Sequence, residues 1–132
     1  MKWIQKVSEI MVRKVITATP KASLMEVARL MRKSRIGSVI IVKDHEPVGI
    51  LTESDFIKLV ARGTDMKSAQ AQDFMHRNIV TCEPSLTVID ALMVMRAEKI
   101  RHLPVVKTSR LVGVISIRDL IAATQFTSLY VI

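Results

Sequence analysis

The stretch GILTESD at residues 49–55 recurs 64 residues later as GVISIRD at residues 113–119. Each copy reads as a glycine, a short apolar run typical of a strand, a hydroxyl residue, and an aspartate where a helix is expected to begin. Each copy therefore predicts a hydroxyl and a carboxylate where a strand turns into a helix. We call Thr52 with Asp55 the first corner and Ser116 with Asp119 the second corner.

The repeat extends well beyond these corners. At the same offset the two halves align without a gap from about residue 7 to residue 57, with identical pairs such as Met11/Met75, Pro20/Pro84 and Gly49/Gly113. Two copies are too few for an open solenoid, so we expect a closed pair of repeats related by a pseudo-twofold axis.

Each repeat is predicted to begin with a short helical turn and continue as strand, helix, strand, strand and helix. Ser23 followed by Glu26 is a capping box that opens a helix, and the apolar runs at 38–42 and 48–52 flank a polar turn and indicate a hairpin. The predicted segments are 7–11, 15–17, 23–33, 38–42, 48–52 and 53–61 in the first repeat, and 71–75, 79–82, a helix from 87, 102–106, 111–116 and 117–125 in the second.

The predicted fold class is α/β (α+β), with two β-α-β-β-α repeats whose sheets pack together and whose helices lie outside. Each repeat alone is too small for a comfortably stable core, so joining them is expected to stabilise both. The domain boundaries follow the repeat: 7–62 and 71–125, with a linker at 63–70 and an apolar tail at 126–132.

The composition of the 132 residues is that of a globular protein, with 49% hydrophobic residues and a formal net charge of +8. The charge favours anionic partners, but the basic residues are scattered, so a solvated basic surface is an equal alternative. The single Cys82 cannot form an internal disulfide, and the first residues lack the apolar run of a signal peptide. We therefore expect a cytoplasmic protein without a membrane span.

Catalytic signatures are missing from the sequence. No Ser-His-Asp or paired-carboxylate pattern is visible, and the three histidines lack metal-ligand spacing. Cys82 lies in an apolar segment without a neighbouring base, which is typical of a buried core thiol. We expect neither an enzyme nor a metal site.

The ordered motifs resemble a known family. An Ile-Thr…Pro…Ser opening, the two Gly-hydrophobic-hydrophobic-Thr/Ser-x-x-Asp corners, and IRHLPVV at residues 100–106 together resemble a tandem pair of cystathionine-β-synthase (CBS) domains, a Bateman module. The resemblance covers residue 7 to about 125 and leaves no catalytic or DNA-binding domain, so it implies a stand-alone regulatory protein. It also implies a sensor that binds adenosine-containing ligands (AMP, ADP, ATP, S-adenosylmethionine or NAD) in two clefts between the halves. Such pairs commonly form disc-like homodimers, need no resident cofactor and act on a regulated protein.

The resemblance also implies which residues bind. Asp55 and Asp119 match the family's ribose-binding aspartate, because an ionised carboxylate accepts hydrogen bonds from adjacent hydroxyls. The alternative is that both corners only cap a helix, and the two roles do not exclude each other. Apolar neighbours such as Ala22 and Val80 match the adenine position, with ordinary core packing as their alternative. The matching residues are Thr17, Ala22, Gly37, Ser38, Thr52, Asp55, Val80, Thr81, Arg101, His102, Ser116, Arg118 and Asp119.

The two clefts are not expected to be equivalent. The second repeat carries Arg101-His102 and Arg118 at positions where the first has uncharged residues, and arginine matches phosphate oxygens. In the family each cleft draws on both repeats. One cleft would combine Ser116, Arg118, Asp119 and His102 with Thr17, Gly37 and Ser38, and the other Thr52 and Asp55 with Thr81 and Arg101. The first of these is predicted to bind phosphorylated ligands more tightly.

Two other functions stay open. A basic nucleic-acid-binding CBS protein would explain the charge, although clustered basic tracts and interleaved aromatics are missing. A structural partner module with degenerate clefts is the other alternative.

Overall fold

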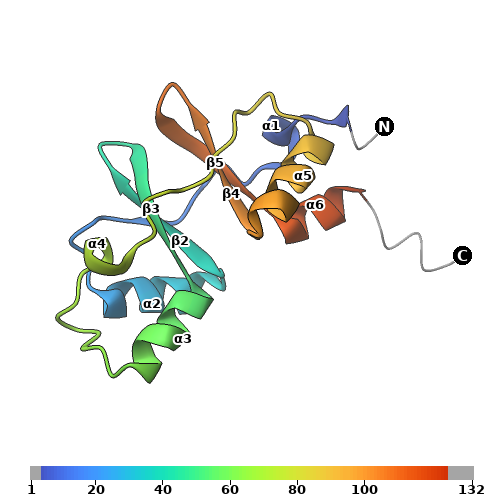
Figure 1. Cartoon of the computed structure of the whole chain (residues 1–132). Coiled ribbons are helices and arrows are strands. Elements are labelled where there is room, and N and C mark those ends of the chain that lie inside the picture. Colours follow the sequence, from blue (N-terminus) through green and yellow to red (C-terminus); the bar gives the residue numbers. More distant parts are fainter. Residues whose placement is uncertain (1–3, 125–132) are drawn as a thin grey trace, which may run out of the picture. The chain divides into compact units, whose positions relative to one another are not determined.

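The computed structural model describes residues 4–124 and divides the chain into two compact units (Figure 1). Residues Ile16–Ile79 form one, which we call the middle unit. Among the described residues, those up to Val15 and those from Val80 onward form the other, the terminal unit. The predicted mixed α/β class is confirmed, with two small sheets and covering helices. The predicted apolar tail at 126–132 lies outside the described residues. No helix between residues 4 and 124 is long and apolar enough to cross a bilayer.

The middle unit is built on a three-stranded sheet in the order β1-β2-β3. The parallel pair is β1 with β2, and β2 pairs antiparallel with β3. Its elements are β1 (Thr17–Ala18), α2 (Leu24–Ser34), β2 (Ser38–Lys43), β3 (Glu46–Thr52), α3 (Glu53–Ala61) and α4 (Ala71–Phe74). The core of this unit consists of Leu24, Val27, Met31, Val39, Ile41, Leu51, Leu59, Ala71 and Met75.

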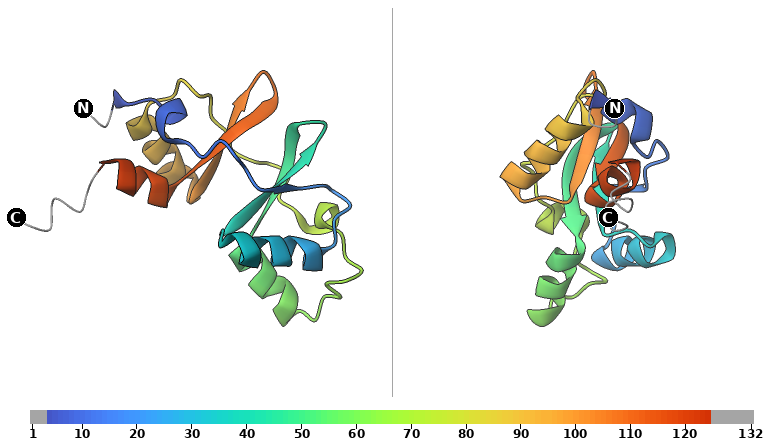
Figure 2. Two further views of the ribbon diagram at one scale, coloured as in Figure 1. Left: turned by 180° about the vertical axis from the view of Figure 1, so that it is seen from behind. Right: turned by 90° about the vertical axis from the view of Figure 1, so that its right-hand side faces the viewer.

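The terminal unit is built on the antiparallel hairpin β4-β5. Its elements are α1 (Val7–Ile10), α5 (Val88–Glu98), β4 (His102–Lys107), β5 (Arg110–Ser116) and α6 (Ile117–Thr124). Figure 2 shows α1, drawn in blue, beside the orange α5 and red α6 of the distant second repeat. The core of this unit consists of Val7, Met11, Val88, Ala91, Met95, Leu103, Val105, Ile115 and Leu120.

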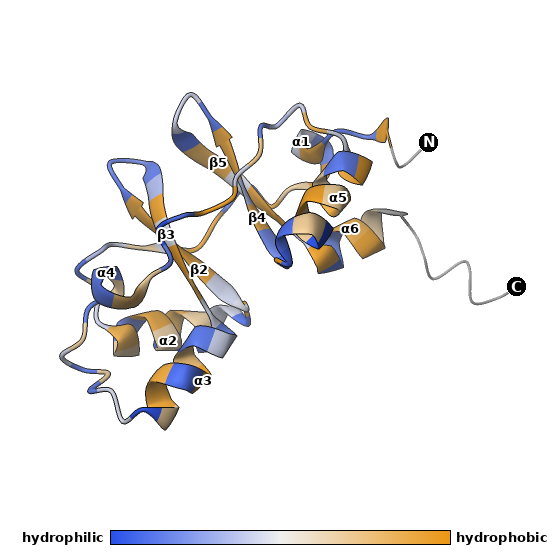
Figure 3. Ribbon diagram, viewed as in Figure 1, coloured by the Kyte–Doolittle hydropathy of each residue, from blue (hydrophilic) through white to orange (hydrophobic). Residues whose placement is uncertain are grey.

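Local signals set the helix starts and the hairpin turns. The Ser23 Oγ accepts the Glu26 N–H at 3.0 Å, and the Thr87 Oγ1 accepts the Asp90 N–H at 3.3 Å, so both predicted helix caps are present. Both hairpins turn through two residues with positive φ, such as Asp44 and Thr108, which suits the right-handed twist of the strands. Figure 3 shows the hairpin tips as hydrophilic and the strand centres as hydrophobic.

The compact units divide the chain differently from the sequence repeats, because each repeat gives its first short helix to the other repeat's core. The Val7 N–H bonds the Leu86 carbonyl at 2.7 Å, and the Val88 N–H bonds the Gln5 carbonyl at 2.8 Å. In the middle unit the Ala71 N–H bonds the Ala22 carbonyl at 2.8 Å in the same way. Completing either core therefore requires a segment from outside its own repeat.

A methionine of each exchanged segment packs on the glycine that opens a corner. A Cβ placed on Gly113 would lie 2.5 Å from Met11 Sδ, and one on Gly49 would lie 2.6 Å from Met75 Cγ. Both distances are far below van der Waals contact, so each glycine is needed for close approach rather than for turn geometry. In each unit the repeated glycine and the repeated methionine therefore contact each other.

The first predicted strand of each repeat needs correction. The segment predicted at 15–17 is a two-residue strand at Thr17–Ala18, and the one predicted at 79–82 is reduced to a single parallel bridge between Cys82 and Val105. Cys82 donates to the Pro104 carbonyl at 3.0 Å and accepts from the Val106 N–H at 2.8 Å. The next rung would need an N–H at position 104, which proline lacks. In the middle unit Ile40 holds this position and the second rung forms.

Candidate functional site

The second corner forms where β5 ends at Ser116 and α6 begins at Ile117. The Asp119 Oδ2 accepts the Ser116 N–H at 3.0 Å and the Ser116 hydroxyl at 2.9 Å. The Ser116 Oγ in turn accepts the Asp119 N–H at 3.1 Å. All three bonds cap the helix, and the two that involve the carboxylate use the same oxygen, Oδ2. The other oxygen, Asp119 Oδ1, receives no hydrogen bond from residues 4–124.

The first corner repeats this arrangement with one addition. The Asp55 Oδ2 accepts the Thr52 N–H at 2.8 Å and the Thr52 hydroxyl at 3.0 Å. The Asp55 Oδ1, however, lies 2.7 Å from Nε2 of His76. The Asp55 side chain is 12% exposed and that of His76 is 61% exposed, so the imidazole covers the carboxylate from the solvent side.

This environment favours an ionised Asp55. Partial burial raises the pKa of the carboxyl group, but the hydrogen bonds from His76 and from the Thr52 N–H and hydroxyl outweigh it. The net result is a pKa of Asp55 below the ordinary value. Asp55 is thus a charged acceptor at neutral pH, held by three donors from its own unit.

Backbone pairing explains why residue 76 reaches this corner. Ile50 of β3 and His76 exchange both N–H···O bonds, at 3.1 and 3.0 Å. Val114 of β5 and Val12 exchange the equivalent pair at 3.0 and 2.9 Å. The residue after each exchanged helix is therefore fixed to the strand that leads into a corner. Sequence reasoning missed the role of His76, although position 76 aligns with position 12 at the repeat offset and differs from it chemically.

The hairpin register places further predicted residues beside each corner. Ser38 pairs with Thr52, and the Gly37 carbonyl accepts the Glu53 N–H at 3.1 Å. His102 pairs with Ser116, and the Arg101 carbonyl accepts the Ile117 N–H at 3.0 Å. Each pair thus lies beside the corner of its own repeat. That some of these residues bind a ligand at the corner of the other repeat stays a prediction.

The second corner is the basic one. Arg118 lies in the first turn of α6 and Arg101 just before β4, and both side chains are exposed. Neither forms an ion pair with any residue that the structure describes. The corresponding first-corner positions, Gly37 and Ser54, carry no charge. The basic groups of the second repeat therefore lie next to the corner in sequence and strand order, and the predicted difference in phosphate affinity between the clefts stays a prediction.

The remaining predicted residues have mixed surroundings. Thr17 and Thr81 are exposed. Val80 packs on the terminal unit's core and Ala22 on the middle unit's core. For these two apolar residues, core packing is therefore at least part of the role.

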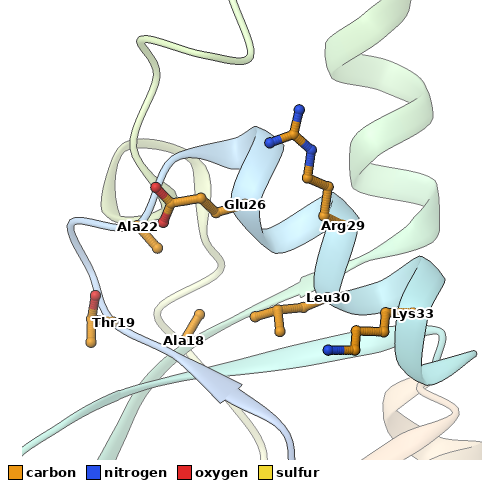
Figure 4. Close-up of a pocket in the computed structure, with 7 residues that line it drawn as sticks. All are labelled: Ala18, Thr19, Ala22, Glu26, Arg29, Leu30 and Lys33. Carbon is orange, nitrogen blue, oxygen red and sulfur yellow. The ribbon is translucent and has the colours of Figure 1, made fainter.

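An open pocket of about 430 Å³ lies beside α2 on the middle unit (Figure 4). In the figure the Leu30 side chain points toward Ala18, whereas the Arg29 guanidinium points away. The lining residues are Ala18, Thr19, Ala22, Glu26, Arg29, Leu30 and Lys33. Of the predicted ligand-binding residues only Ala22 is among them, so this pocket is not the first corner.

The described part of the chain shows neither a grouped metal site nor a reactive thiol. Within residues 4–124 no three His, Cys, Asp or Glu side chains are grouped as a metal site. Burial raises the pKa of the Cys82 thiol to about 11, which keeps it protonated and unreactive at neutral pH.

Comparison with known proteins identifies the family. The CBS domain matches residues 7–62 and 71–125, and this chain belongs to the CBS domain family. The Uncharacterized protein MK0525 of Methanopyrus kandleri is 37% identical over 123 residues, which cover 91% of this chain and 63% of that protein. The chain thus spans a little under two-thirds of that relative.

A second relative is an enzyme. The inosine-5'-monophosphate dehydrogenase of Thermoplasma acidophilum is 31% identical over 128 residues, which cover 96% of this chain but 25% of the enzyme. The likeness therefore concerns a quarter of that protein.

Solved structures share the fold closely. A candidate signal-transduction protein with CBS domains from Burkholderia ambifaria has a TM-score of 0.85 and 28% identity, covering 91% of this chain and 93% of that one. MJ1225 of Methanocaldococcus jannaschii, described as a candidate archaeal homologue of g-AMPK, has a TM-score of 0.83 and 26% identity over 96% of this chain and 49% of that one. A hexameric CBS-CP12 protein from bloom-forming cyanobacteria has a TM-score of 0.83 and 28% identity over 95% of this chain and 75% of that one.

Proposed function

We propose that this chain is a non-catalytic regulatory module that binds an adenosine-containing ligand, with the second corner as the principal ribose and phosphate site. The observation that carries the proposal is Asp119 Oδ1, an acceptor to which no described residue donates a hydrogen bond. A carboxylate fixed through its other oxygen is prepared to accept ribose hydroxyls.

The cations around this corner support the same ligand class. Arg118 directly precedes the aspartate and has no ion-pair partner among the described residues. Arg101, which the family resemblance assigns to the cleft of Asp55, precedes the strand that pairs with β5 and likewise has no ion-pair partner among them. An arginine fork matches two phosphate oxygens at once. Ribose at Asp119 and phosphate at Arg118 would together select a nucleotide over a free nucleoside.

The relatives are consistent with a regulatory role. One is described as a candidate homologue of g-AMPK, and another is a dehydrogenase of which this chain matches a quarter. Ligand binding would act by shifting the population between two arrangements of the module, to the extent of its differential affinity for them. That each ligand is shared between the two repeats stays a prediction of the family resemblance.

The test is calorimetry and thermal unfolding with AMP, ADP, ATP, S-adenosylmethionine and NAD. A ligand present at about 100 times its Kd adds about 2.7 kcal/mol to the unfolding free energy, which raises Tm by on the order of 10 °C for a chain of this size. Asp119→Asn is expected to weaken binding about tenfold or more, since a hydrogen bond to a charged group is lost. Asp55→Asn is the matched control, because it disturbs the same helix cap at the first corner.

The outcomes separate the alternatives. Equal losses of affinity from the two substitutions would contradict the preference for the second corner. If none of the five ligands changes Tm, the adenosine proposal fails and the structural-module alternative takes its place.

We also propose that the module self-associates as a homodimer. The helix α3 presents Ile57 at 71% exposure and Val60 at 64%, and α5 presents Met93 at 54%. Ile57 and Val60 are three positions apart and so share one face of α3, and a contiguous exposed apolar patch marks an interaction site. Sedimentation of the wild type and of Ile57→Glu tests this, with a dimer expected for the former and a monomer for the latter. A monomeric wild type at high micromolar concentration would contradict it.

A further inference from the structure

The two corners differ at the residue of the exchanged segment whose backbone is bridged to the strand that enters each corner. His76 occupies this place at the first corner and Val12 the equivalent place at the second. The places are equivalent because both residues make the same two-bond backbone bridge to the strand that enters the corner. The two corners therefore share the same backbone bridge and differ in the side chain at this position.

The difference changes which carboxylate oxygens can accept a ligand. At both corners Oδ2 is used by the backbone N–H and hydroxyl of the residue that caps the helix. At the first corner Oδ1 also has a partner, the His76 imidazole at 2.7 Å. Valine has no donor, so Val12 cannot occupy Asp119 Oδ1 in this way.

The contact is built so that it can open. His76 is 61% exposed, and its side chain has no other hydrogen-bond partner among residues 4–124. Rotation of the imidazole into solvent would break only this bond, while Asp55 would remain held by Thr52. The backbone bridge to Ile50 would also persist, because it does not involve the side chain.

From this juxtaposition we propose that His76 is a latch on Asp55, which occupies the ribose-accepting oxygen so that a ligand binds the first corner only after displacing the imidazole. The proposal rests on the proposed function, since it assigns a regulating residue to one of the same two corners. It makes the corners a graded pair, because the described residues occupy Oδ1 of Asp55 and leave Oδ1 of Asp119 without a donor.

The latch can be tested without any ligand. Carboxyl-carbon NMR titration would follow the pKa of Asp55 in the wild type, in His76→Val and in His76→Gln. Valine copies the residue at the equivalent place, and glutamine retains a neutral donor. We expect the pKa of Asp55 to rise most in His76→Val and less in His76→Gln, with the Asp119 resonance as the internal control. An unchanged pKa of Asp55 in both variants would overturn the latch.

The effect on binding is tested in reciprocal variants, using AMP as the probe. Asp119→Asn isolates the first corner, and adding His76→Val is expected to strengthen AMP binding there about two- to tenfold, the range of one hydrogen bond. Asp55→Asn isolates the second corner, and adding Val12→His is expected to weaken AMP binding there by a similar factor. Backbone amide spectra of each variant would verify the fold.

The failures are distinguishable. Weaker AMP binding after His76→Val would overturn the latch, because it would make His76 a ligand-binding residue. If no protein in the set, wild type included, binds AMP or any other adenosine ligand, the proposed function fails, while the titration of Asp55 still decides whether the latch exists.

Discussion

Because the repeats exchange their short helices, shortening a side chain of the first helix should destabilise the unit in which that side chain is buried. Val7 belongs by sequence to the first repeat, yet its side chain is completely buried in the core of the terminal unit. Val7→Ala removes two buried methyl groups. The transfer free energy of these groups is about 1.6 kcal/mol, and the cavity left behind brings the expected loss of unfolding free energy to about 2–3 kcal/mol.

The assay is urea unfolding combined with amide hydrogen exchange. Urea unfolding measures the loss, and exchange measures its location. We expect larger losses of protection in β4 and β5 than in β2 and β3, because Val7 packs with Leu103 and Ile115 and not with the middle unit's core. Val12→Ala is the matched control, since it removes the same atoms from a side chain that is 44% exposed.

The result that would refute this reasoning is a reversed pattern. If Val7→Ala loosens β2 and β3 while β4 and β5 keep their protection, the first helix packs on its own repeat and the exchange is wrong. A loss no larger than that of Val12→Ala would equally contradict the burial of Val7.

Three further predictions concern the corners and the sheets. Because the pKa of Asp55 is lowered by folding, its ionisation stabilises the protein above the unfolded pKa of about 4, and the stability advantage of the wild type over Asp55→Asn should shrink as pH falls below that value in acid-unfolding curves. Gly113→Ala should lower the unfolding free energy by about 1–3 kcal/mol, and the smaller loss expected in a Met11→Ala background would show in a double-mutant cycle that the two residues are in contact. Pro104→Ile should add the missing rung of the parallel ladder, seen as a slowly exchanging amide at residue 104, whereas a fast-exchanging amide there would contradict the account of the shortened strand.

Much of the candidate site could be predicted from the sequence because its determinants are local. The corner bonds join residues three positions apart, such as Ser116 and Asp119, and the helix cap at Ser23 has the same spacing. Interactions this close along the chain are specified by residue type and order, so a repeated motif predicts a repeated geometry. The charge difference between the corners could also be predicted, because it depends only on residue type.

The strand predicted at 79–82 fails for a reason that is not local to those residues. The β-branched pattern there is typical of a strand, but pairing depends on the partner's backbone, and Pro104 lies more than twenty residues away. The proline was visible in the sequence, but its consequence appears only once Cys82 is placed beside Val105. Strand propensity is a property of one segment, whereas a ladder of backbone hydrogen bonds requires two.

By itself the sequence determined the repeat, the caps, the hairpins and the two corners, because each depends on short-range hydrogen bonds and on apolar periodicity. Only the tertiary structure decided that Val7 completes the second repeat's core and that His76 reaches Asp55, 21 positions away. Such contacts depend on which surfaces meet after the elements have formed. The two corners look alike in sequence, but long-range packing brings His76 onto Oδ1 of Asp55, whereas no described residue donates to Oδ1 of Asp119.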